Sequence, residues 1–327
     1  MAGRELPESA KKILVTGGAG FIGSTLTERL LARGDHIVCL DDFDDFYDPA
    51  IKRRNLTTAQ ASPAFRLVEG DICDLPLLQS LFAQEAFDVV VHIAARAGVR
   101  PSILQPLLYQ KVNVEGSTNL FEMARRHEVA NFVFTSSSSV YGENEKVPFA
   151  ESDPVDYPIS PYAATKRAGE LIAHTYHHLF GLNITCLRPF TVYGPRQRPE
   201  MAIHLFTRAI LEGKPIRMFG DGSSSRDYTY IDDLVDGFIR AIDRPLGYRI
   251  INLGEHEVTT LRELIDLIAD ATGKEPIIDP QPMQPGDVPR TYADVARAKE
   301  LLGYQPRISM GEGIRRFVEW YRATEGG

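Results

Sequence analysis

A glycine cluster set between a short apolar run and an amphipathic segment constrains this chain more than any other feature. The run at 12–16 predicts a buried strand, and Gly17, Gly20 and Gly23 follow it before a helical pattern that extends to about residue 33. In such a strand–turn–helix unit the first glycine permits a tight turn, the second lets backbone approach a pyrophosphate, and the third lets helix pack on strand. The helix N-terminus also offers free N–H groups to phosphate oxygens. We therefore expect a dinucleotide to bind at the start of an α/β fold.

A second apolar run follows this helix and ends at an acidic residue. The run occupies 36–40, and Asp41 comes 18 residues after Gly23. An acid at this position of a dinucleotide-binding unit binds the 2′-hydroxyl of a ribose, and its charge repels a 2′-phosphate. The sequence therefore favours NAD over NADP. The alternative is a glycine turn beside a solvated acid, with no dinucleotide.

The first half of the chain alternates between apolar runs and helical patterns. Near-continuous apolar strands separated by helices indicate a parallel sheet buried on both faces. We therefore predict an α/β, Rossmann-type doubly wound sheet, which binds ligands beyond the carboxyl ends of its strands. The further apolar runs lie at 65–68, 87–92, 131–135 and 183–187, with helical patterns notably at 106–127 and 161–180. The residues that follow strand ends, and should line one crevice, are Gly17, Asp41, Asp71, Ala94 and Ser136 to Ser139.

Downstream of Pro189 the alternation decays, and proline and glycine become more frequent. We expect a smaller C-terminal substrate-binding domain that closes over the crevice. Short helical patterns remain around 201–212, 260–271 and 310–324. The division that we predict assigns 1–188 and about 231–252 to an NAD-binding domain, and 189–230 and about 253–327 to the substrate-binding domain.

Composition narrows the class of protein. The chain has 327 residues and a net charge of −8, which argues against a nucleic-acid partner. Its three cysteines form no CxxC pair, and together with the lack of a signal peptide they suggest reduced thiols and a cytoplasmic location. No apolar run reaches 18 residues, so no membrane anchor is expected. His174, His177 and His178 have helical spacing, but no further ligand motif accompanies them, and we expect no metal site.

Tyr162 and Lys166 are four residues apart, directly after the helix-starting pair Ser160–Pro161. On a helix this spacing places both side chains on one face, so that their polar ends can converge. A nearby ammonium favours phenolate and should lower the tyrosine pKa, which would give a base that works near neutral pH. Such a pair is usually a surface pair, but here the glycine motif and a serine run support a catalytic reading. A hydroxyl of that run, 136–139, could hydrogen-bond both Tyr162 and a substrate hydroxyl.

From Lys12 to about Tyr321 the chain resembles the extended short-chain dehydrogenase/reductases, specifically the NAD-dependent epimerase/dehydratase family. The general motifs are TGGAGFIG (16–23), DI (71–72), HIAA (92–95), NVEG (113–116), SSSSVYG (136–142), YAATK (162–166), LRPF (187–190) and RDYTYIDD (226–233). Within the family the chain is most similar to UDP-glucuronate 4-epimerases. The motifs that carry this closer resemblance are DDFDDFYDP (41–49), AGVRPS (97–102), FTVYGPRQRPEMA (190–202) and PGDVPRTYAD (285–294).

The resemblance implies a reaction and a set of residues. Tyr162, assisted by Ser137, removes the proton of the sugar 4-OH while hydride passes to NAD, and a 4-keto sugar turns over before hydride returns from transient NADH. Lys166 holds the nicotinamide ribose and stabilises the phenolate. The implied NAD-binding residues are Gly17, Gly20, Phe21, Ile22, Gly23, Asp41, Asp71, Ile72, Ala94, Ala95, Asn113, Ser136, Tyr162, Lys166 and Pro189. The implied substrate-binding residues are Arg100, Ser138, Ser139, Thr191, Arg198, Arg217, Arg226 and Asp287.

The implied substrate-binding residues form two groups, one that binds the nucleotide and one that recognises the sugar. Arg226 matches the arginine that binds the diphosphate, Asp287 matches an acid near the uridine ribose, and Arg217 is placed on the uridine side. Thr191 and Arg198 are proposed to receive the C6 carboxylate, with Arg100 as a second candidate. Related enzymes pair two helices per subunit into a dimer, so a homodimer is expected.

Other functions remain open from sequence. A UDP-glucose or UDP-N-acetylglucosamine 4-epimerase is the nearest alternative, followed by a UDP-glucuronate decarboxylase. A 4,6-dehydratase would carry an Asp-Glu pair where this chain has Ser138 and Ser139. An NAD-sensing binding protein would have lost Tyr162 or Lys166, and both are present.

Overall fold

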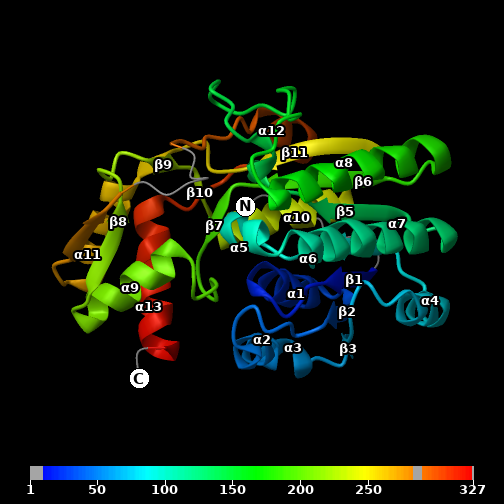
Figure 1. Cartoon of the computed structure of the whole chain (residues 1–327). Helices are drawn as coiled ribbons and strands as arrows, with labels where there is room; N and C mark the ends of the chain where they lie inside the picture. The colour runs from blue at the N-terminus through cyan, green and yellow to red at the C-terminus, as the bar shows by residue number, and fades with distance from the viewer. Residues whose placement is uncertain (1–9, 283–288, 326–327) are drawn as a thin grey trace.

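The computed structural model describes residues 10–282 and 289–325, and it is organised around a seven-stranded parallel sheet (Figure 1). The strands lie in the order β11-β6-β5-β4-β1-β2-β3, so the order reverses between β1 and β4. This is the doubly wound arrangement, in which ligands bind where the order reverses. The predicted Rossmann-type sheet is confirmed. Its strands are β1 (Lys12–Thr16), β2 (His36–Asp41), β3 (Phe65–Glu69), β4 (Val89–His92), β5 (Asn131–Thr135), β6 (Ile184–Pro189) and β11 (Tyr248–Leu253).

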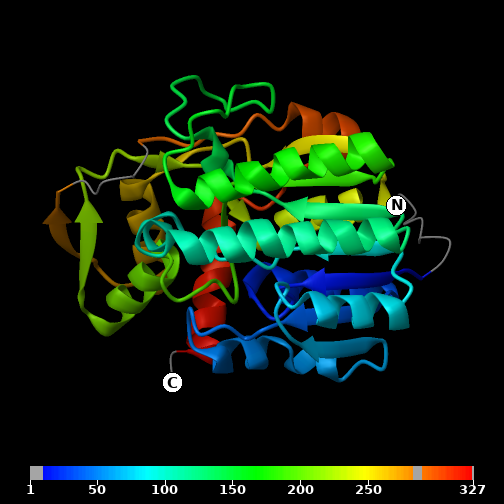
Figure 2. The ribbon, with the colours of Figure 1, turned by 45° about the vertical axis from the view of Figure 1, so that its right-hand side comes forward.

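Helices cover both faces of the sheet because alternate strand residues point to opposite sides. Ile13 and Val15 of β1 belong to one apolar core, whereas Leu14 belongs to the other. The first core is closed by α1 (Phe21–Arg33) and α10 (Ile231–Asp243), and the second by α4 (Leu75–Gln84), α7 (Ser117–Arg126) and α8 (Pro161–Phe180). Figure 2 shows α7 and α8 running side by side across the front of the sheet.

Local signals fix the ends of α8, the helix that carries Tyr162 and Lys166. The Ser160 hydroxyl accepts a hydrogen bond from the N–H of Ala163 at 3.1 Å, and Pro161 occupies the first turn. Gly181 ends the helix in the left-handed conformation. The helical pattern predicted at 106–127 is also present, as α6 (Pro106–Gln110), a π-helical segment η1 (Lys111–Gly116) and α7. Shorter helices are α2 (Pro49–Asn55), α3 (Thr57–Gln60), α5 (Val99–Leu104) and the 3-10 turn η2 (Ser138–Tyr141).

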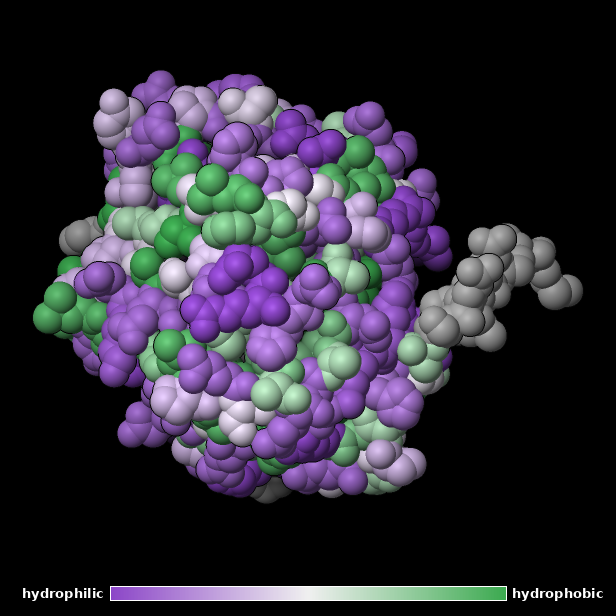
Figure 3. Space-filling model, turned by 90° about the vertical axis from the view of Figure 1, so that its right-hand side faces the viewer, coloured by the Kyte–Doolittle hydropathy of each residue, from purple (hydrophilic) through white to green (hydrophobic). Residues whose placement is uncertain are grey.

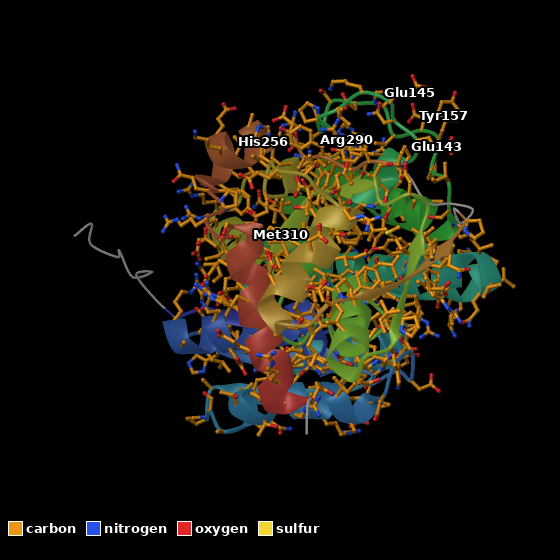
Figure 4. The ribbon with its side chains drawn as sticks, turned by 90° about the vertical axis from the view of Figure 1, so that its left-hand side faces the viewer. Glu143, Glu145, Tyr157, His256, Arg290 and Met310 are labelled. Carbon is orange, nitrogen blue, oxygen red and sulfur yellow. The ribbon has the colours of Figure 1, made fainter. Side chains whose placement is uncertain are left out.

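A smaller unit lies at the left of Figure 1 and contains the three short helices that the sequence predicted. Its apolar side chains, among them Ile203 and Phe317, join the same core as α1 and α10. The carbonyl of Met310, at the start of α13 (Figure 4), accepts a 3.5 Å hydrogen bond from Tyr193. The helices of this unit are α9 (Ala202–Glu212), α11 (Leu261–Thr272) and α13 (Met310–Thr324), whereas α12 (Ala296–Leu302) lies beside β11 of the large sheet. The paired strands are β7 (Thr191–Tyr193) with β10 (Tyr228–Tyr230), β8 (Pro215–Phe219) with β13 (Ile277–Gln281), and β9 (Ser225–Arg226) with β12 (Thr259–Thr260).

The described part of the chain contains neither a membrane-spanning helix nor a metal-binding group of side chains. Within 10–282 and 289–325, no helix has the length and apolar character needed to cross a membrane. The same residues contain no group of three or more histidine, cysteine or acidic side chains placed to hold a metal ion.

Candidate active site

Two cavities adjoin one another. The first, of about 820 Å³, lies at the carboxyl ends of the strands of the large sheet, and the second, of about 810 Å³, lies against α9 and β8. Arg100 and Glu200 line both cavities, so they mark the place where the two meet. The predicted residues that line the first cavity are Gly17, Gly20, Phe21, Ile22, Gly23, Asp41, Asp71, Ile72, Ala94, Ala95, Arg100, Ser136, Ser137, Ser138, Ser139, Tyr162, Lys166, Pro189, Thr191 and Arg198. Arg217 and Arg226 line the second cavity, and Asp287 lies outside the described residues.

The glycine turn after β1 forms a shallow concave surface of backbone, here called the glycine cradle, which side chains at these positions would fill. Gly17 has φ +70°, and a Cβ there would stand 2.7 Å from the nitrogen of Ala94. A Cβ at Gly23 would stand 2.1 Å from the carbonyl oxygen of Gly17, so only glycine lets α1 approach the turn. No side chain caps the N-terminus of α1, where Gly20 is the cap residue, so its N–H groups face the cavity. Gly18, which the sequence reasoning passed over, is also restricted, because a Cβ there would meet the Cys39 sulfur at 2.5 Å.

Asp41 is held in place at the end of β2. Its carboxylate accepts hydrogen bonds from the N–H groups of Ala19 and Phe43, both at 3.0 Å. Burial raises its pKa, and the ammonium of Lys52, 4.0 Å away, opposes the shift. Lys52, which the sequence motifs did not single out, also lines the cavity. The arrangement gives the carboxylate a fixed orientation toward a ribose at the strand end.

Asn113 lies behind the cavity wall rather than in it. Its amide oxygen accepts the N–H of Arg96 at 2.8 Å, and its amide nitrogen donates to the Arg96 carbonyl and to Thr165, each at 3.0 Å. The residue therefore ties the loop after β4 to η1 and α8. This placement differs from the direct cofactor contact that the resemblance implied.

Tyr162 and Ser137 meet in the first cavity. Ser137 is the N-cap residue of the η2 turn. Its hydroxyl donates a hydrogen bond to the hydroxyl oxygen of Ser139, which lies 3.1 Å away. Burial raises the pKa of Tyr162, whereas the hydrogen bond with Ser137 and the positive charge of Arg198 lower it. The ring of Tyr109 packs edge-on against Tyr162, with centroids 6.3 Å apart.

The prediction that Lys166 lowers the pKa of Tyr162 is wrong for this structure. The net shift of the tyrosine pKa is upward, and its opposing causes are Ser137 and Arg198. The reason is geometric, because the Lys166 ammonium donates to the carbonyl of Thr135 at 2.7 Å. Burial also lowers the pKa of Lys166 to about 7, against the influence of Glu170. Lys166 is therefore a buried donor at the end of β5.

A buried ion pair supports the catalytic wall and was not foreseen. Glu170 is fully buried and accepts two hydrogen bonds from Arg188, at 2.7 and 2.8 Å. It also accepts the Ser136 hydroxyl at 2.6 Å, so Ser136 points toward this pair although it lines the cavity. Glu170 lies one helical turn after Lys166, and this spacing was the only sequence signal.

Arg198 brings a positive charge to the first cavity. Its Nε lies 3.1 Å from Glu200, and its guanidinium stands over the Phe46 ring at 5.6 Å. Arg96, on the opposite wall, also stands over Phe46, at 5.8 Å, and pairs with Asp44. Asp44 and Phe46, which belong to the DDFDDFYDP motif but were assigned no role from sequence, also line the cavity.

Thr191 opens β7 and lines the same cavity as Arg198 and Tyr162. Its N–H donates to the Asp227 carbonyl at 3.1 Å, which fixes its position beside β10. Thr191 and Arg198 thus line the same cavity as the tyrosine.

The second cavity is rich in arginine. Arg226 comes from β9 and Arg217 from β8, which is paired with β13. Arg226 also donates to the Ser225 carbonyl at 2.9 Å. Figure 4 places Arg290 near the top of this side of the molecule, where its guanidinium stands over Tyr292 at 5.5 Å. Guanidinium groups match phosphate oxygens in geometry and charge, so this cavity suits an anionic ligand portion.

Together the sheet, the glycine cradle and the tyrosine–serine pair define a dinucleotide-dependent enzyme that moves a proton at a substrate hydroxyl. The family model described as NAD dependent epimerase/dehydratase family matches residues 13–254. The chain therefore belongs to the NAD-dependent epimerase/dehydratase family, and its cofactor is NAD. The cradle, the uncapped N-terminus of α1 and the acid at the end of β2 fit this group.

Three relatives illustrate the similarity. A UDP-glucuronate 4-epimerase of Thermodesulfobacterium geofontis is 42% identical over 308 residues, which cover 94% of this chain and 95% of that protein. The crystal structure of a Bacillus cereus UDP-glucuronic acid 4-epimerase in complex with UDP-glucuronic acid and NAD has a TM-score of 0.88 and 36% identity, covering 95% of this chain and 99% of that one. The structure of a Thermotoga maritima UDP-glucose 4-epimerase with UDP-glucose also has a TM-score of 0.88, at 35% identity, covering 96% of this chain and 99% of that one.

Proposed function

We propose that this protein is a UDP-glucuronate 4-epimerase, which interconverts UDP-glucuronate and UDP-galacturonate through a 4-keto sugar. The single observation that carries the proposal is the placement of Arg198 and Thr191 in the cavity that holds Tyr162. A guanidinium at that end matches a sugar that bears a carboxylate at C6. The relative from Thermodesulfobacterium geofontis and the Bacillus cereus structure support the same substrate.

Tyr162 acts as the proton carrier at the sugar 4-OH. Ser137 is hydrogen-bonded to the phenol and orients both the phenol and the substrate hydroxyl. Arg198 favours the phenolate through its charge, and Lys166 places a buried donor at the end of β5 beside a bound ribose. When bound, NAD supplies a reversible hydride acceptor for C4. The tyrosine then returns the proton on completion, so the reaction consumes no base.

The carboxylate of the substrate creates a hazard that a neutral hexose does not. After oxidation at C4 the sugar is a β-keto acid, which loses CO2 when the bond from C5 to the carboxylate aligns with the carbonyl π system. Arg198 and Thr191 hold the carboxylate charged and hydrogen-bonded, and keep that bond out of alignment. Arg100, at the junction of the cavities, is the second candidate for this contact.

The nucleotide occupies the second cavity in this proposal. Arg226 binds the diphosphate, and Arg217 faces the uridine side. Asp287 remains proposed as the acid near the uridine ribose. Residues 1–188 with about 231–252 then form the NAD-binding domain, and 189–230 with about 253–327 the nucleotide-sugar-binding domain. The entry of β11 into the parallel sheet supports the return at 231–252.

We also infer a cytoplasmic homodimer. Three large apolar side chains of α8, Leu171, Leu179 and Phe180, are more than half exposed, as are three on α5 and α6. Figure 3 shows that the face at the right of Figure 1 carries apolar groups among hydrophilic ones. All three cysteines are free thiols, which supports a reducing compartment. Light scattering of the protein and of a Leu179→Asp variant tests the dimer, because the variant should be monomeric and a monomeric parent would contradict the inference.

The direct test of the activity compares three substrates. UDP-glucuronate, UDP-glucose and UDP-N-acetylglucosamine are incubated separately with the purified protein, and the products are analysed by NMR. The proposal expects UDP-galacturonate as the main product, with much slower conversion of the other two sugars. Preferred conversion of UDP-glucose would instead support the second candidate, a UDP-glucose 4-epimerase, which the Thermotoga maritima structure favours.

A further inference from the structure

Arg198 and Glu200 form an ion pair inside a single tight turn. The N–H of Met201 donates to the Arg198 carbonyl at 3.1 Å, and Pro199 occupies the turn between the two charged residues. The Nε of Arg198 lies 3.1 Å from a Glu200 oxygen. Because proline restricts the turn, little conformational entropy is lost when the two side chains pair. The pair is therefore a built-in feature of the loop that presents Arg198.

Glu200 stands where an anionic substrate must pass. It lines both cavities, and its side chain is 41% exposed, whereas that of Arg198 is 22% exposed. Burial raises the pKa of the Tyr47 phenol on the cavity wall, and both charges also act on it, since Arg198 lowers this pKa and Glu200 raises it. A carboxylate at this place would repel a nucleotide-linked uronate unless Arg198 offset its charge.

We propose that Glu200 is a specificity-determining residue that acts as the internal counter-ion of Arg198. This inference rests on the proposed function, in which Arg198 receives the C6 carboxylate. A uronate must share the guanidinium with Glu200 or replace it there. A sugar with a neutral C6 leaves the pair intact, so Arg198 is not left without an anion in a largely buried position. Glu200 thus weakens the binding of uronates and makes the binding of sugars with a neutral C6 less unfavourable.

Replacing Glu200 by glutamine should move the two classes of sugar in opposite directions. In Glu200→Gln the KM for UDP-glucuronate should fall about 3- to 10-fold while kcat changes less than about twofold, because a partly exposed charge acts mainly on binding. The inhibition constant of UDP-glucose as a competitor should rise about threefold. Measuring an inhibition constant makes the comparison independent of whether UDP-glucose is turned over.

Two matched variants separate charge from structure. Glu200→Asp keeps the charge and should keep the ratio of the two constants within about twofold of the parent. In an Arg198→Gln background, the further change Glu200→Gln should no longer raise the inhibition constant of UDP-glucose, because no guanidinium is left without an anion. Circular dichroism of each variant confirms that the fold is retained.

The inference is overturned if Glu200→Gln raises the KM for UDP-glucuronate or leaves it unchanged, since Glu200 would then only orient Arg198 or play no part. An equal rise of the inhibition constant of UDP-glucose in the Arg198→Gln background would overturn it as well. If the unmodified protein failed to convert UDP-glucuronate, the proposed function itself would be wrong. This outcome is measured on the unmodified protein alone, so it is distinguishable from failure of the inference about Glu200.

Discussion

The cofactor end and the sugar end of the active site are built in different ways. At the cofactor end, backbone N–H groups, glycines without side chains and buried, paired groups follow the ends of sheet strands. At the sugar end, partly exposed arginines stand on turns and face acids and aromatic rings. The first arrangement is rigid and indifferent to the substrate, whereas the second relies on charge. Substitutions at the cofactor end should therefore affect every substrate or the stability of the fold, and those at the sugar end should change which sugar is preferred.

The largest effect is expected for Tyr162→Phe, which removes the proton carrier but keeps the ring that packs against Tyr109. Loss of a general acid–base group lowers kcat by about 10³-fold, and the loss should be equal for every UDP-sugar. Steady-state kinetics and the NAD content of the purified variant measure this. Tyr109→Phe is the control, since its hydroxyl donates to the Ala97 carbonyl, and it should lose less than about tenfold.

Glu170→Gln tests the buried support of the catalytic wall. The change leaves the Arg188 guanidinium without its carboxylate in a site that is 1% exposed. Removing one partner of a buried pair lowers the free energy of unfolding by about 3 kcal/mol. Urea unfolding measures the loss, and Glu69→Gln, in an exposed pair with Arg53, should show almost none. Equal losses in the two variants would contradict the difference between the buried and exposed pairs.

Arg198→Ala sharpens the comparison at the sugar end. The value of kcat/KM for UDP-glucuronate should fall about 10²-fold, because a carboxylate loses a charged partner, and UDP-glucose should be much less affected. NMR of the products should also reveal a 4-keto pentose if CO2 escapes. Arg217→Ala, in the second cavity, should instead weaken the binding of both substrates to the same extent. Normal turnover of UDP-glucuronate by Arg198→Ala would remove the carboxylate assignment.

Per pH unit, the smallest effect is a dependence of stability on pH. His92 is buried between the hydroxyls of Thr16 and Ser117, and burial lowers its pKa to about 3. The unfolded chain takes up a proton near pH 6.5, so the free energy of unfolding should decrease as pH falls from about 6.5 toward 3. The slope from this residue is at most about 1.4 kcal/mol per pH unit. Urea unfolding at several pH values should show a smaller slope for His92→Gln, and an unchanged slope would rule out this source.

The same contrast explains what the sequence could and could not predict. Asp41, Asp71 and Ala94 were found because residues at the ends of parallel strands must meet at one edge of the sheet. The Glu170–Arg188 pair was missed because it depends on how α8 packs on β6, which no local pattern encodes. Asn113 was placed at the cofactor by its motif, whereas its hydrogen bonds hold the loop after β4.

The direction of the tyrosine pKa was also beyond the sequence. Helical spacing correctly put Tyr162 and Lys166 on one face, but spacing does not reveal that the ammonium donates to the Thr135 carbonyl. Burial then outweighs the charges that act on the phenol. At the proposed sugar end, the sequence assigned no role to Asp44 and Phe46, because their contacts with Arg96 and Arg198 depend on loop geometry that no local pattern encodes.

Isotope transfer tests the central claim most directly. The protein is supplied with UDP-glucuronate that carries deuterium at C4, and the C4 position of the product is examined by NMR. If the reaction removes hydride from C4 and returns it to the opposite face while Tyr162 carries only the hydroxyl proton, UDP-galacturonate will retain the deuterium at C4. Exchange of that deuterium with water would show that a proton leaves carbon instead, and would contradict the mechanism.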